Sequence, residues 1–187
     1  MEVKMERFEL KATNTHPHFI GSWMIEPPSL CDDIIEFFET NKSLQIAGTA
    51  GGEVNRNIKN STDIAIHPKD TELESFKSIQ KYIGCLYACY SDYVRSWPYL
   101  KEMASRLDIG SFNIQRYLKG EHFQRVHAER VNLQNSHRLL AWMTYLNTVE
   151  DGGSTSFPHY DLEVQPQRGH TLIWPADWTH AHCGNII

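Results

Sequence analysis

The chain has 187 residues, of which 41% are hydrophobic and 11% aromatic, and its formal net charge is −5 at pH 7. These values are typical of one ordinary folded domain, and the absence of a basic stripe argues against a nucleic-acid partner. No apolar run approaches the roughly 20 residues of a membrane span, and the charged N-terminus, MEVKMERFELK, lacks an apolar signal-peptide core. The four cysteines indicate neither a disulfide framework nor a zinc site. We therefore expect a cytoplasmic protein without a membrane partner.

The N-terminal part is predicted to supply a helix and the first strands. One or two short strands are expected within residues 1–27, where Phe8 and Leu10 alternate with charged residues. Ser29 is expected to cap a helix that begins at Leu30 and ends near Asn41. The glycine-rich segment 47–52 is interpreted as a connection, because no Lys-Ser pair follows it as in a phosphate-binding loop. A strand is expected over residues 59–66.

A long amphipathic helix is predicted from Asp70 to just before Pro98. Apolar residues recur there at three- and four-residue spacing, at Phe76, Ile79, Ile83, Leu86, Tyr90 and Val94. The residue before a proline avoids helical backbone angles, so the helix should end at that point. Cys85 and Cys89 within it are interpreted as packing residues, because no partner ligands for a metal accompany them.

After Gly110 the pattern changes from helical to strand periodicity. In residues 112–118, Phe112, Ile114, Arg116 and Leu118 alternate with Asn113, Gln115 and Tyr117. Residues 139–146 form a nearly continuous apolar run, as expected for a strand buried on both faces. Further strands are expected at 162–164 and 171–174, with turns at 151–153 and 166–169. Helices followed by strands predict an α+β protein whose β part is a barrel or a sandwich.

His127 and Glu129 form a candidate metal site within this β region. On a strand, residues two apart project to the same side, so an imidazole nitrogen and a carboxylate oxygen would face one point. A third ligand would come from the WTHAH segment, where alternation places His180 and His182 on one face. Two imidazoles and one carboxylate leave the opposite coordination positions open, as in non-haem Fe(II) oxygenases. A lone His-x-Glu is a weak signal, and a hydrogen-bonded histidine at a strand end explains His127 equally well.

Other motifs accompany this pair. They are the tyrosine at 117, Tyr-Leu-Asn at 145–147, Gly-Gly-x-Thr-x-Phe at 152–157, and the segment from Gly169 to the final His-x-Gly. The series resembles the iron(II)/2-oxoglutarate-dependent oxygenases, in the prolyl 4-hydroxylase-like branch with its microbial and phage members. The resemblance covers residues 110–187 and extends more loosely to the N-terminal half.

The resemblance implies a double-stranded β-helix, a jelly-roll or cupin-like barrel with the N-terminal helices packed on one sheet. Residues 1–187 would then form a single oxygenase domain. Residues 1–109 would provide helical support and the first strands, and residues 110–187 the metal-binding barrel core.

The resemblance also implies roles for individual residues. His127, Glu129 and His182 match the iron ligands, and the His-x-Gly ending favours His182 over His180. His180 would then be a neighbour of the ligands or a substrate contact.

Three further residues match positions that surround the co-substrate. Tyr117 and Tyr145 correspond to residues that line the 2-oxoglutarate pocket, and Thr155 lies in the matching glycine-rich turn.

The implied activity is that of an Fe(II)- and 2-oxoglutarate-dependent dioxygenase that hydroxylates a substrate carbon. A prolyl residue in a peptide or protein is the first candidate, a small molecule is the alternative, dioxygen is the second substrate, and ascorbate is a candidate reductant. Two other classes stay open: a cupin-like metal enzyme that does not use 2-oxoglutarate, and a non-catalytic jelly-roll binding module. A zinc hydrolase is disfavoured, because its paired histidines usually lie on a helix.

The sequence departs from the family pattern at two places. Glu129 stands where the family usually has aspartate, and the Lys or Arg expected about ten residues after the last histidine is missing before Ile187. We expect the natural chain to continue past Ile187 with that cation on the same inward face, so that the 187-residue form binds 2-oxoglutarate weakly. Arg138 and Arg116 are the internal alternatives for a partner of the buried carboxylate.

Overall fold

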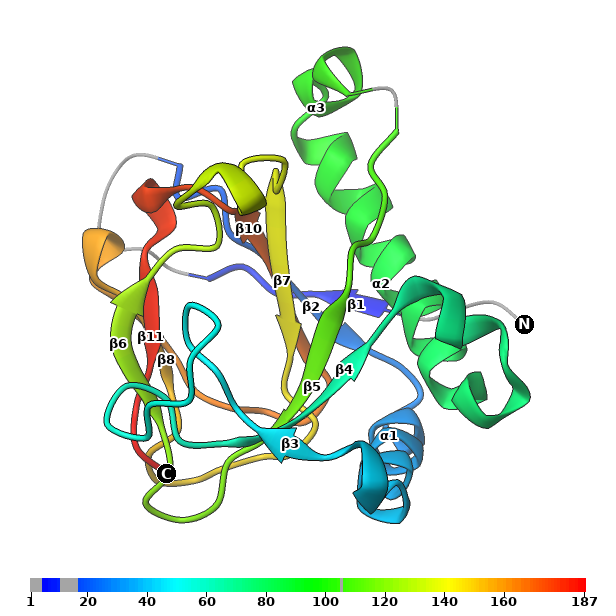
Figure 1. Cartoon of the computed structure of the whole chain (residues 1–187). Coiled ribbons are helices and arrows are strands. Elements are labelled where there is room, and N and C mark those ends of the chain that lie inside the picture. The colour runs from blue at the N-terminus through cyan, green and yellow to red at the C-terminus, as the bar shows by residue number, and fades with distance from the viewer. Residues whose placement is uncertain (1–4, 11–16, 105) are drawn as a thin grey trace.

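A computed structural model describes residues 5–10, 17–104 and 106–187 (Figure 1). Their strands pair antiparallel and form three sheets. The first has the order β1 (Met5–Arg7), β2 (Gly21–Ile25), β10 (His170–Pro175) and β7 (Leu140–Thr144). The second has the order β6 (Phe123–His127), β11 (His182–Gly184), β8 (Thr155–Phe157) and β9 (Leu162–Val164). The third has the order β3 (Ile46–Ala47), β4 (Thr62–Ile66) and β5 (Phe112–Arg116).

The helices pack on the side of the first sheet that faces away from β6 and β11 (Figure 1). They are α1 (Ser29–Thr40), α2 (Lys77–Ser96) and the short α3 (Tyr99–Met103). A cluster of buried residues joins this layer to the sheet, with Ile34 and Ile79 from the helices and Trp23 and Ile173 from the strands. None of the helices in the described ranges has the length and the apolar composition that a bilayer crossing requires.

A second buried cluster lies between the first and second sheets. Because side chains alternate along a strand, β10 contributes Leu172 and Trp174 to this cluster and Ile173 to the cluster under the helices. Phe157 and Val164 of the second sheet complete the contact. The α+β class with antiparallel sheets is therefore confirmed.

The apolar run at 139–146 is confirmed as a strand with hydrophobic contacts on both faces. In β7, Leu140 and Trp142 pack against the cluster under the helices. Ala141 and Met143 belong to the cluster between the sheets. The short strands predicted near 162–164 and 171–174 correspond to β9 and β10. Two short strands, β1 and β2, also lie within residues 1–27 as predicted.

Two helix starts differ from the prediction. Ser29 is the first residue of α1 rather than its cap, and Pro28 occupies the cap position without a side-chain hydrogen bond. The long helix begins at Lys77, because residues 68–76 form two 3-10 turns instead. Asp70 accepts a hydrogen bond from the His67 N–H at 3.1 Å, a local contact that stabilises a separate turn. The helix ends at Ser96, before Pro98, as predicted.

A buried ion pair ties β4 to the segment before it. The Lys59 ammonium lies 2.6 Å from Asp63 Oδ2, and both side chains are about 3–4% exposed. Ser61 donates a hydrogen bond to the other carboxylate oxygen at 2.7 Å. Gly48 lies against this cluster so closely that a Cβ atom would come within 2.0 Å of Ser61 Oγ. The segment after β3 therefore covers the pair and excludes water from it.

Removing one member of this pair should be more harmful than removing both. We expect Asp63→Ala to lower the free energy of unfolding by about 3–5 kcal/mol, because it leaves a buried ammonium unpaired. Replacing both residues by apolar ones, Lys59→Met with Asp63→Leu, should recover most of that loss. Urea unfolding of the three proteins measures this, and a loss below about 1 kcal/mol for Asp63→Ala would contradict the described burial.

Candidate metal centre

The metal cluster begins with the pairing of β6 and β11. These strands are antiparallel neighbours in the second sheet (Figure 1). Their register sets His127 directly opposite His182. Side chains directly opposite each other project from the same face of a sheet. The two imidazole rings are accordingly 4.5 Å apart between centroids, with 54° between their planes.

Glu129 completes the cluster from the loop that follows β6. Its Oε1 atom lies 3.7 Å from His127 Nε2 and 3.9 Å from His182 Nε2. One ligand atom from each of the three residues lies within 4.8 Å of the others. A divalent metal bound at about 2.1 Å separates neighbouring ligand atoms by roughly 3.0–3.5 Å, so only small side-chain shifts are needed to hold one.

The main chain fixes which nitrogen of each ring faces the cluster. His127 Nδ1 lies 2.9 Å from the carbonyl oxygen of Arg125, and His182 Nδ1 lies 2.9 Å from that of His180. A carbonyl oxygen only accepts, so each Nδ1 carries the proton. Each Nε2 then has its lone pair free beside Glu129, which is the tautomer that a metal requires.

Burial keeps both imidazoles neutral at neutral pH. It lowers the pKa of His182 to about 4, with a further lowering by the nearby His127. The pKa of His127 is also lowered, mainly by burial. The cluster thus combines two neutral nitrogen donors with one carboxylate oxygen, a set that suits Fe(II) and similar divalent metals.

Aromatic rings surround the two histidines. Phe123 stacks on His127 with 3.9 Å between ring centroids and 17° between planes. Trp174 and Phe157 lie 5.0 Å and 5.6 Å from the His182 ring. Trp174 is 2% exposed, and within the described residues its indole N–H has no hydrogen-bond partner. These rings restrict the imidazole rotamers and leave one buried donor beside the cluster.

His180 does not share the face of His182, so the prediction from strand alternation is wrong here. It lies in the 3-10 turn Trp178–His180, which interrupts the strand before β11 begins. Its buried ring has Nε2 2.8 Å from the His18 carbonyl oxygen and 3.2 Å from the Tyr160 hydroxyl. His180 contacts a ligand only through its carbonyl oxygen, which accepts from His182.

The structure brings together two of the three residues predicted around the co-substrate. Tyr145, just after β7, donates its hydroxyl hydrogen to Thr155 Oγ1 of β8 at 2.7 Å. Tyr117, just after β5, instead donates to Gln115 Oε1 at 2.7 Å. Burial raises the pKa of both tyrosines, which therefore remain protonated donors.

The internal arginines named as partners for a buried carboxylate are engaged elsewhere. Arg116 Nη1 donates to both carboxylate oxygens of Glu39, at 2.7 and 3.0 Å, with its guanidinium over the Phe38 ring. Arg138 Nη1 donates to Glu129 Oε2 at 2.6 Å. The sequence revealed neither this contact nor the buried Lys59, whose ammonium lies 5.5 Å from the centroid of the Phe123 ring. The available sequence signal for the burial of Lys59 was its two-residue spacing from the polar residues at 61 and 63.

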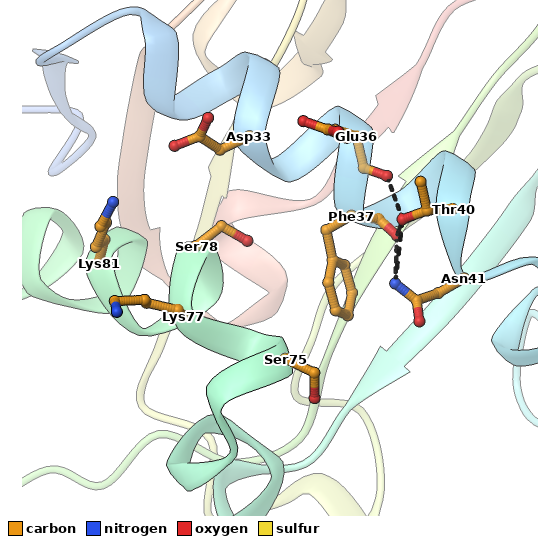
Figure 2. Close-up of a pocket in the computed structure, with 9 residues that line it drawn as sticks. All are labelled: Asp33, Glu36, Phe37, Thr40, Asn41, Ser75, Lys77, Ser78 and Lys81. Carbon is orange, nitrogen blue, oxygen red and sulfur yellow. Dashed lines mark hydrogen bonds between the residues drawn. The ribbon is translucent and has the colours of Figure 1, made fainter.

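A separate hollow lies between α1 and the start of α2 (Figure 2). Asp33 and Glu36 line it from α1, and Lys77 and Lys81 line it from α2. Its lining includes none of the residues of the metal cluster. It is therefore a groove of the helical layer, distinct from the candidate metal centre.

Comparison with protein families identifies the region that carries the cluster. Residues 112–186 match the model of the 2OG-Fe(II) oxygenase superfamily, and all three residues of the metal cluster lie in the matched segment. The match supports the activity that the sequence motifs predicted, that of an oxygenase dependent on Fe(II) and 2-oxoglutarate. A comparison with curated protein sequences finds no match.

Solved structures with the same fold include prolyl hydroxylases. The chain is similar to a prolyl-4-hydroxylase of Pseudomonas putida, with 16% identity, a TM-score of 0.68, and coverage of 90% of this chain and 86% of that one. It is also similar to the viral collagen prolyl hydroxylase of Paramecium Bursaria Chlorella virus-1 in complex with 2-oxoglutarate. There the identity is 17%, the TM-score is 0.56, and coverage is 96% of this chain and 86% of that one.

The buried histidines predict a dependence of stability on pH in the metal-free protein. The folded-state pKa of His182, about 4, lies below the unfolded value of 6.5, so the unfolded chain binds that proton first. We expect the free energy of unfolding, measured with a chelator present, to fall by about 2–4 kcal/mol between pH 6.5 and pH 4 from this residue. His182→Asn should show a smaller fall, because it keeps only the contributions of other buried histidines such as His170. Equal falls in both proteins would contradict the described burial of His182.

Proposed function

We propose that His127, Glu129 and His182 bind the Fe(II) of this oxygenase. The observation that carries the proposal is the convergence of two unprotonated Nε2 atoms on one carboxylate oxygen. Two imidazoles and one carboxylate occupy one face of the metal and leave the opposite positions open. The bound metal and 2-oxoglutarate supply the oxidising chemistry with dioxygen, and the protein supplies binding, orientation and exclusion of water.

We further propose that Tyr145 and Thr155 hold 2-oxoglutarate, with Tyr117 as a third donor. Tyr145 and Thr155 hydrogen-bond to each other, Tyr145 packs against the cluster between the two sheets, and Thr155 is buried. A protonated hydroxyl donates to a carboxylate oxygen, and such a charged hydrogen bond contributes on the order of 1.5–3 kcal/mol. The buried indole N–H of Trp174 is a further donor beside His182.

The arrangement that we propose for these sheets is a double-stranded β-helix, formed by residues 1–187 as one domain. Residues 110–187 would form its metal-binding core, and residues 1–109 its helical support and first strands. The two larger sheets enclose one buried cluster, and Phe112 of the third sheet packs on Trp142 of β7 with 5.8 Å between centroids. These contacts and the fold similarity to the two prolyl hydroxylases support the barrel.

The substrate class that we propose is a prolyl residue in a peptide or protein. Both similar solved structures bear the name of a prolyl hydroxylase, and this supports the proposal by analogy of fold. Ascorbate is proposed as the reductant on the resemblance alone. Succinate formation above the substrate-free rate, measured over a panel of proline-containing peptides and small molecules, tests this class. Stimulation by small molecules alone would contradict it.

Alanine variants of the three proposed ligands test the metal site. We expect His127→Ala, Glu129→Ala and His182→Ala to bind Mn(II), a redox-stable substitute for Fe(II), more than about 100-fold more weakly, because each removes a direct ligand. Succinate formation should be lost in each, while circular dichroism shows a folded chain.

His180→Ala is the matched control for His182→Ala. It should keep the metal affinity and lower the free energy of unfolding by about 1–3 kcal/mol, because its buried ring partners lose their hydrogen bonds. Loss of metal in His180→Ala with retention in His182→Ala would transfer the ligand role to His180.

Tyr145→Phe tests the co-substrate site. We expect it to weaken 2-oxoglutarate binding by about 10- to 100-fold, the loss of one hydrogen bond to a charged group, while Mn(II) affinity stays unchanged. Tyr82→Phe is the matched control, because its hydroxyl contacts Thr144 Oγ1 at 2.9 Å on the helix side of β7. Isothermal titration with 2-oxoglutarate measures both. Equal affinities of the two variants would exclude Tyr145 from the site.

A further inference from the structure

The two carboxylate oxygens of Glu129 have different neighbours. Oε1 lies between the two imidazoles, 3.7 Å and 3.9 Å from their Nε2 atoms. Oε2 is turned away from them and accepts a hydrogen bond from Arg138 Nη1 at 2.6 Å. We propose that Arg138 is a positioning residue, which holds Glu129 so that one oxygen binds the metal and the other does not.

The length of Glu129 creates the need for such a contact. Glutamate has one more rotatable bond than the aspartate usual at this position, so it loses more side-chain freedom on binding a metal. Its free carboxylate could also chelate the metal through both oxygens and occupy a position that 2-oxoglutarate or dioxygen requires. A charge-assisted hydrogen bond from an arginine removes both difficulties, because it fixes the rotamer and engages the second oxygen.

The loop between β6 and β7 is built to keep these two residues together. Ala176, which is 1% exposed, accepts a hydrogen bond from the Arg130 N–H at 2.9 Å and donates one to the Leu139 carbonyl oxygen at 3.0 Å. Both ends of the loop are thus tied to one buried residue. Glu129 is next to one tied position and Arg138 is next to the other.

The middle of the same loop is closed by a side-chain clamp. Asn135 Oδ1 accepts hydrogen bonds from the N–H groups of Val131 and Asn132, each at 2.8 Å. Asn132 Oδ1 accepts in return from the Asn135 N–H at 3.2 Å. The loop therefore has a defined shape before any metal binds, and Arg138 does not have to be ordered by the metal.

The solvent exposure of Glu129 and Arg138 indicates that their ion pair positions a ligand rather than stabilises the fold. The side chains of Glu129 and Arg138 are 30% and 45% exposed, and ion pairs this accessible contribute about 0–1 kcal/mol to stability. Loss of Arg138 should therefore change metal binding and leave folding almost unaffected. Arg130 offers a control in the same loop, since it pairs with Asp177 at 3.5 Å and has no contact with Glu129 among the described residues.

The test is a Mn(II) titration of the metal-free protein, with free Mn(II) followed by electron paramagnetic resonance. Arg138→Gln should bind Mn(II) about 10-fold or more weakly than wild type, the usual effect of losing a group that orients a ligand. Arg138→Lys should recover part of the affinity, and Arg130→Gln should equal wild type. All variants should unfold in urea within about 1 kcal/mol of wild type.

A second pair of variants shows whether Arg138 acts through Glu129. In the background Glu129→Asp the shorter carboxylate does not reach both the metal and Arg138, so adding Arg138→Gln should change Mn(II) affinity less than about twofold. An unchanged affinity of Arg138→Gln in the wild-type background, or an equal loss in both backgrounds, would overturn the inference.

This inference depends on the proposed ligand set. The same Mn(II) titration distinguishes an error in the ligand set from an error in the role of Arg138. If Glu129→Ala loses Mn(II) and Arg138→Gln does not, the ligand assignment stands and the role of Arg138 is wrong. If Glu129→Ala binds Mn(II) as well as wild type, both are wrong.

Discussion

The candidate site depends on the in-register pairing of β6 with β11. This pairing sets His127 opposite His182. Each ring is oriented by the carbonyl oxygen of the residue two positions before it, which accepts from its Nδ1. A shift of the register by one residue would turn one imidazole to the other face of the sheet. The geometry of the metal cluster is thus a property of backbone pairing first and of side-chain packing second.

The rest of the fold packs around the paired strands and shields the two histidines from water. The first sheet packs against the second through one apolar cluster, and the helices cover the opposite face of the first sheet. Phe123, Phe157 and Trp174 bring aromatic surface directly against the two histidines. That burial lowers the pKa of both histidines, so the packing also keeps their Nε2 atoms unprotonated and able to bind a metal.

The sequence predicted those elements of the fold that depend on interactions between residues close together in the chain. Strand alternation singled out His127 and Glu129, and the family resemblance singled out His182; the three do lie together. The resemblance also singled out Tyr145 and Thr155, which hydrogen-bond to each other. The α+β class was predicted from the change from helical to strand periodicity along the chain, and strand β7 from its continuous apolar composition.

What the sequence did not reveal depends on non-local or capping interactions. His180 was placed on the wrong face, because a 3-10 turn replaced the expected strand. The start of α2 was placed seven residues early, because Asp70 caps a separate turn. The contact of Arg138 with Glu129 depends on hydrogen bonds from both ends of their loop to Ala176. The burial of Lys59 and Asp63 depends on the segment around Gly48, which covers the pair. None of these can be inferred from spacing alone.

The central claim is that Glu129 and the two histidines form one Fe(II) site that admits 2-oxoglutarate. Anaerobic addition of 2-oxoglutarate to the Fe(II)-loaded protein, followed by visible absorbance, tests this claim most directly, because chelation of ferrous iron by a 2-oxo acid gives a charge-transfer band. We expect a band that saturates with 2-oxoglutarate in the wild-type protein and is absent in Glu129→Ala. A wild-type protein without the band, or a band of equal intensity in Glu129→Ala, would contradict it.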